Sequence, residues 1–187
     1  AGGAEPGDAS GAEPGDASGA EHGYTVVQKM GGGEALRMST DPAVASHGLQ
    51  PVPWGGVSAC TRAGDGGATL AVHGRPYVLL PLPSSTGLPV HVNGFFEISS
   101  NRRDIWYGDD MIGAGKLRSD WNRALLHDVV APSYARLLSE VKLELQGQAR
   151  YFELWPSSRP AEPWGGLVDT LYGLLLDQPV LYSEGTA

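Results

Sequence analysis

The sequence predicts an α+β domain in which a mixed or antiparallel sheet of three to five strands is packed by a long kinked helix and a second, shorter helix, behind a disordered N-terminal tail. Three observations predict it. Apolar residues alternate with polar ones in the middle of the chain, a four-residue apolar period runs through residues 119–146, and the first 22 residues contain almost nothing that can be buried.

The tail is an acidic low-complexity repeat. Residues 3–10 read GAEPGDAS, residues 11–18 repeat them letter for letter, and no base accompanies the acids. Such a segment cannot offset its chain entropy, so residues 1–23 are predicted to be disordered. Because the chain starts with Ala inside this repeat, we expect it to be a piece of something longer.

Residues 24–66 are predicted to form an irregular linker. Their few apolar clusters are interrupted by Gly31-Gly32-Gly33 and by several prolines. At most one helical turn or strand is expected there, at Tyr24–Met30. The folded domain is therefore expected to span residues 67–187.

Strands are predicted after this linker. Two β-rich runs, residues 68–72 and 76–82, flank His73-Gly74-Arg75, where a glycine suits a tight turn, and this pattern predicts a hairpin. A third strand is expected within residues 88–99, with a bulge at Asn93-Gly94.

The strongest helical signal covers residues 119–146, with Ser119 or Asp120 as the expected cap. Trp121 begins an apolar stripe that is expected to face the sheet. Pro132 removes a backbone donor, so the helix should kink or restart there.

A shorter helix is expected to start near Pro163, since proline suits the first helical turn, and to run through Leu175. Residues 179–182 are predicted to form a short terminal strand. The predicted fold is therefore two helices packed on one sheet.

Composition excludes several function classes. The formal net charge of −8 argues against a nucleic-acid partner, because tracking phosphates requires clustered Lys and Arg. The chain has no run of eighteen apolar residues, so no membrane partner is expected. The single Cys60 excludes an intramolecular disulfide and fits a reducing compartment, which predicts a cytoplasmic location.

Two motifs resemble catalytic signatures and fail on inspection. The run Tyr107–Met111, YGDDM, resembles the paired aspartates of polymerases, but two-metal chemistry needs another carboxylate and a far larger domain. The run Gly113–Lys116 departs from a phosphate-binding loop at two positions. The five histidines show no metal-ligand spacing, so we expect no metal.

The segment SSNRRDIW remains. Arg102 and Arg103 adjoin Asp104, so one guanidinium could pair internally while the other reaches a phosphate or an acidic partner. A structural Arg–Asp pair that closes the loop is an equal alternative.

Several long segments of the sequence resemble sequences of the sacsin-repeat family. They are GLPVHVNGFFEISSNRRDIWYGDD, which LLPLP precedes, KLRSDWNRALLHDVVAPSYARLL, YFELWP and EPWGGLVDTLYGLLLDQPVLYSE, and the resemblance as a whole covers about residues 70–184. The resemblance implies a chaperone-associated protein in which an ATPase-like domain, of the heat-shock-chaperone and gyrase type, lies upstream. That domain's Asn-bearing helix and D-x-G-x-G loop are absent here, so no cofactor is expected in this chain, and ATP and Mg only where an upstream domain is present.

A weaker analogy concerns the transducer domain of gyrase-B and mismatch-repair ATPases. Val92-Asn93-Gly94 and the word from Lys116 to Ala124 are similar to its strand end and helix start. That domain lends a basic residue to the nucleotide site beside it, which at the level of fold alone implies an interface role here.

The resulting prediction is a non-catalytic module of a sacsin-like chaperone or co-chaperone. Its expected partners are a neighbouring ATPase-like domain in the parent chain and chaperone or client proteins. The candidate residues for an interface or phosphate contact are Arg102, Arg103, Asp104 and Asn93. The alternatives are a self-contained nucleotide- or metal-binding enzyme that uses the RRD and GDD loop, and a plain protein-interaction scaffold.

Overall fold

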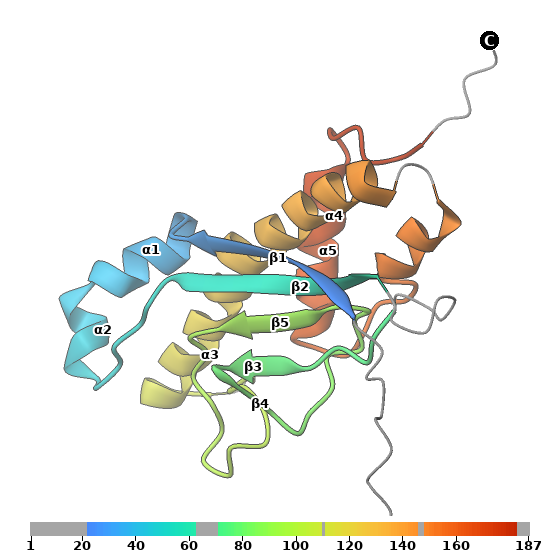
Figure 1. Ribbon diagram of the computed structural model, residues 1–187. Helices are drawn as coiled ribbons and strands as arrows, with labels where there is room; N and C mark the ends of the chain where they lie inside the picture. Colours follow the sequence, from blue (N-terminus) through green and yellow to red (C-terminus); the bar gives the residue numbers. More distant parts are fainter. Residues whose placement is uncertain (1–21, 63–70, 110, 146–147, 183–187) are drawn as a thin grey trace, which may run out of the picture.

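A computed structural model describes residues 22–62, 71–109, 111–145 and 148–182. It confirms the predicted α+β class, with helices α4 and α5 behind a twisted sheet (Figure 1). The acidic repeat predicted to be disordered lies, apart from its last two residues, outside the described residues.

The sheet is mixed and has five strands in the order β1-β2-β5-β3-β4. Neighbouring strands are antiparallel except for β3 and β5, which run parallel. The strands are β1 (Gly23–Met30), β2 (Trp54–Arg62), β3 (Pro76–Val78), β4 (Leu80–Pro81) and β5 (His91–Gly94).

The prediction of an irregular linker is wrong for residues 24–62, although the strand allowed at Tyr24–Met30 is present, and residues 63–66 lie outside the described ones. This segment forms β1, the helices α1 (Gly33–Thr40) and α2 (Pro42–Ser46), and β2. One glycine of this segment, Gly56 of β2, is required by close packing, since a Cβ on it would lie 2.5 Å from the carbonyl oxygen of Val27. The described fold therefore already includes residues 23–62, ahead of the predicted start at residue 67.

The long helix is confirmed, but it starts earlier than predicted. It consists of α3 (Gly113–Leu125), the π-helical turn η1 (Leu126–Val130) and α4 (Ala131–Leu145). The π turn immediately precedes Pro132, where the sequence predicts a kink. Ser119 caps nothing: it is buried inside α3, and its hydroxyl donates to the carbonyl of Gly108 at 2.9 Å.

Two further strand predictions are wrong. The tight turn lies at Leu79, between β3 and β4, and residues 71–75 form no strand, while residues 68–70 lie outside the described ones. Residues 179–182 also form no strand. Lys142 holds this segment instead, because its ammonium donates to the carbonyls of Pro179 and Leu181.

The core lies between the sheet and the helices. The predicted stripe is confirmed, since Trp121, Leu125 and Val129 are all buried. A 3₁₀ helix, η2 (Ala149–Leu154), and helix α5 (Trp164–Leu175), which begins after Pro163 as predicted, close the far side. None of the described helices is both long and apolar enough to cross a membrane.

Candidate functional site

The two candidate arginines lie at the tip of a closed loop. Ile98 and Ile105 pair across its base, and the Arg102 N–H donates to the carbonyl of Ser99 at 2.8 Å. Arg102 has a φ of 54°, in the left-handed region that non-glycine residues rarely adopt. Arg102 and Arg103 are both exposed at this tip.

Hydrogen bonds, rather than an Arg–Asp pair, close this loop. The Asn101 side-chain oxygen accepts from the hydroxyl of Ser99 at 2.7 Å and from the N–H of Arg103 at 3.0 Å. The Asp104 carboxylate accepts from the Ser84 hydroxyl at 3.1 Å. Among the described residues, no ion pair joins either tip arginine to a carboxylate.

Asn122 of α3 anchors the base of the loop. Its amide nitrogen donates to the carbonyls of Glu97 at 2.7 Å and Trp106 at 2.8 Å, and its oxygen accepts from the N–H of Glu97 at 2.8 Å. The side chain is fully buried. Asn122 belongs to the sequence segment NRALL, but nothing in the sequence indicates that its side chain anchors the loop.

Asn93 lies elsewhere. Its oxygen accepts from the N–H of Leu79 at 3.3 Å, and its side chain lines a groove of about 270 Å³ with Trp54, Tyr77 and His91. Side chains alternate along β5, and buried Val92 faces the helices, so Asn93 faces the open side of the sheet. The structure therefore does not bring Asn93 together with the arginine loop, which is anchored from α3.

An aspartate of the acidic YGDD segment forms a local ion pair. The exposed Asp109 carboxylate lies 2.5 Å from the guanidinium of Arg123, which in turn lies over the ring of Tyr107 at 5.5 Å. Asp110 lies outside the described residues. Within the described ranges, no three His, Cys, Asp or Glu side chains gather in a way that could hold a metal ion.

A cavity that the sequence does not reveal lies between the long helix and α5. It has a volume of about 290 Å³ and is lined by Arg123, His127 and Glu162, among others. The Thr170 hydroxyl lies 3.0 Å from the carbonyl oxygen of Gly166 and 2.9 Å from Nδ1 of His127, so a hydrogen bond joins the imidazole to α5.

Burial lowers the pKa of His127 below its usual value. The unfolded chain takes up its proton near pH 6.5, whereas the folded chain does so only at lower pH, so stability falls as the pH drops through this window. We expect the His127→Asn variant, which keeps a hydrogen-bonding side chain near Thr170 but does not titrate, to lose less stability between about pH 7.5 and pH 5.5.

Urea unfolding at several pH values measures this difference. His91, whose pKa is also lowered by burial, contributes in the same direction and remains in both proteins, so the comparison isolates His127. Equal losses of stability in the variant and the wild type would show that His127 is not the group responsible.

Comparison with known proteins tests the resemblance to the sacsin-repeat family. No protein-family model matches the chain, and no solved structure matches it. Human sacsin is 35% identical to it over 132 residues, which cover 69% of this chain.

The chain carries a sacsin-like region. This confirms the resemblance to the sacsin-repeat family that the segments around the arginine loop indicate. The aligned stretch is 2% of the length of human sacsin, so the chain corresponds to a small part of that protein.

Proposed function

We propose that this chain is a non-catalytic module of a sacsin-like chaperone or co-chaperone. It supports protein folding and quality control beside an ATPase-like domain that lies in the same parent protein. The observation that carries the proposal is the similarity to human sacsin over most of the chain. The chaperone role and the neighbouring ATPase-like domain come from the sacsin-repeat resemblance, and the cytoplasmic location from the lone Cys60.

The arginine loop is the proposed contact with that neighbour. Arg102 and Arg103 are exposed side by side and have no carboxylate partner among the described residues. A guanidinium presents a planar fork of donors that matches a phosphate or a carboxylate. Asn122 and Asp104 hold the loop in place through their hydrogen bonds, so the tip is positioned before any partner arrives.

Two other readings have less support. An enzyme that uses the RRD and GDD loop would need an available Asp109, which is paired with Arg123. A plain scaffold needs no defined anion contact, and the rigid display of two adjacent arginines favours the interface role. The proposal therefore assigns no cofactor to this chain and leaves ATP and Mg to the neighbouring domain.

Isothermal titration of the full chain with ATP and Mg²⁺ tests the non-catalytic assignment. Because no nucleotide cradle is assigned to this chain, we expect no saturable heat up to about 1 mM ATP. Asp109→Asn is the matched variant, since it removes the carboxylate on which the enzyme reading depends. A saturable heat in the wild type that this variant abolishes would favour the enzyme and contradict the proposal.

A further inference from the structure

Strand β1 leaves one side of the sheet open. It is the first strand in the sheet order and pairs with β2 alone. The Gly31 N–H donates to the carbonyl of Pro53 at 2.6 Å, which continues the β1–β2 register by one pair. Hydrogen-bonded pairs alternate along an antiparallel ladder, so every second residue of β1 bonds to β2.

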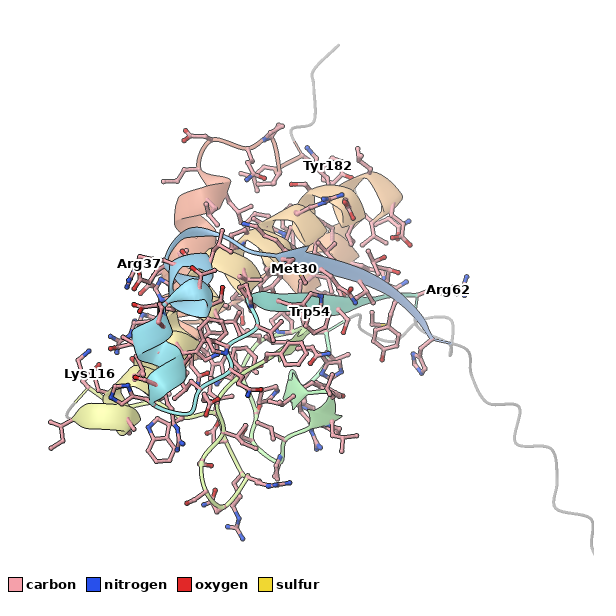
Figure 2. The ribbon with its side chains drawn as sticks, turned by 90° about the vertical axis from the view of Figure 1, so that its left-hand side faces the viewer. Met30, Arg37, Trp54, Arg62, Lys116 and Tyr182 are labelled. Atoms are coloured by element: carbon pink, nitrogen blue, oxygen red, sulfur yellow. The ribbon has the colours of Figure 1, made fainter. Side chains whose placement is uncertain are left out.

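The remaining residues direct their backbone groups away from β2. They are Tyr24, Val26, Gln28 and Met30, whose side chains are all exposed. Within the described part of the chain, none of their N–H or C=O groups forms a backbone hydrogen bond on the outer side. Figure 2 shows β1 as the outermost strand, with Met30 beside Trp54 of β2.

This edge lacks the usual protection against pairing. Natural edge strands are blunted by prolines, charges or bulges along their length. The strand, GYTVVQKM, has no proline, and its only charged residue is Lys29. The Lys29 ammonium is drawn inward, because it donates to the carbonyl of Asp128 at 3.0 Å. The one irregularity in the register lies at its first residue, between Gly23 and Tyr24.

We propose that this edge pairs with the β1 strand of a second copy of the chain. The two strands run antiparallel about a two-fold axis that places Val27 opposite the same residue of the second copy. In this register each outward residue meets another outward residue, so four residues on each strand complete about eight backbone hydrogen bonds. The pairing extends the two sheets into one continuous sheet.

Side chains and charges support a second copy as the occupant. On the open face, Tyr24 comes opposite Met30, and an aromatic ring and a thioether form a favourable pair. On the helical face, Thr25 comes opposite Lys29 of the second copy. The Thr25 hydroxyl donates to the Glu144 carboxylate at 3.0 Å, so the position opposite each lysine is a threonine paired with a carboxylate and not another lysine.

Sedimentation velocity of the full chain, from about 1 to about 200 µM, tests the proposal. The wild type is expected to shift from monomer to dimer across this range. Val26→Pro removes an outward N–H but no bond to β2, and we expect it to weaken the dimer about tenfold or more while circular dichroism stays unchanged. Val26→Thr is the matched control, because it keeps the N–H and the branched side chain.

Two results would overturn the proposal. One is a wild-type protein that stays monomeric over the whole concentration range. This result would count against the proposal even if the β1 edge bound an unrelated extended peptide. The other is a folded Val26→Pro variant that dimerises like the wild type. If Val26→Pro does not fold, Val26→Lys replaces it, since it brings two like charges close together across the axis, and an undiminished dimer in that variant would also count against the proposal.

Discussion

Replacing Trp121 by alanine is expected to reduce the free energy of unfolding by about 3–5 kcal/mol. The indole is almost completely buried at the start of the apolar stripe of α3. Its ring N–H also donates to the carbonyl of Phe95 at 2.9 Å, just beyond the end of β5. The substitution therefore removes a large part of the helix–sheet contact and leaves the Phe95 carbonyl without this donor.

Trp121→Phe separates these two contributions. It keeps an aromatic ring but loses the hydrogen bond and the part of the indole volume that a phenyl ring does not fill, so we expect an intermediate loss of about 1–3 kcal/mol. Urea unfolding followed by circular dichroism measures both variants. A loss below about 1 kcal/mol for Trp121→Ala would mean that this stripe does not hold α3 against the sheet.

Asn122→Ala is expected to cost about 3 kcal/mol, since it leaves three backbone groups of Glu97 and Trp106 without the buried amide that pairs with them. The loss should also be local, because the hydrogen bonds to Glu97 and Trp106 fix the two sides of the arginine loop. We therefore expect the Glu97 amide hydrogen to exchange with solvent much faster in the variant.

Asn122→Asp is the matched control for this prediction. A carboxylate keeps the acceptor for the Glu97 N–H but cannot donate to the two carbonyls while it is ionised. Chemical unfolding and hydrogen exchange follow both variants. If Asn122→Ala unfolds like the wild type and the Glu97 amide stays protected, the loop is held by other contacts.

The fold class could be predicted because local patterns carry it. The apolar period through Trp121, Leu125 and Val129 continues on both sides of Pro132, and it identifies the long helix without any tertiary information. The order of residues 24–62 could not be predicted, because it depends on distant contacts. Helix α1 has no side-chain cap of its own, and the Asp128 carboxylate accepts from the N–H of Ala35 at 3.0 Å.

The candidate site, like the fold, is predictable only where local sequence patterns determine it. The exposure of Arg102 and Arg103 follows from a short polar segment between two apolar ones, which the sequence displays. The position of Asn93 could not be predicted from the sequence. Alternation along a strand separates its residues into two faces but does not indicate which face the helices cover. Nor could the role of Asn122 be predicted, since a buried asparagine in a helix is identified only by the distant carbonyls that it meets.

ATP turnover by a longer piece of the parent protein, which joins the proposed ATPase-like domain to this chain, tests the central claim most directly. The account predicts that the double variant Arg102→Ala/Arg103→Ala folds normally and loses turnover by about tenfold or more, because the proposed anion contact is gone. Arg136→Ala, which removes an exposed arginine paired with Glu140 on α4, is the control and should leave turnover unchanged. Wild-type turnover in a correctly folded double variant would contradict the account.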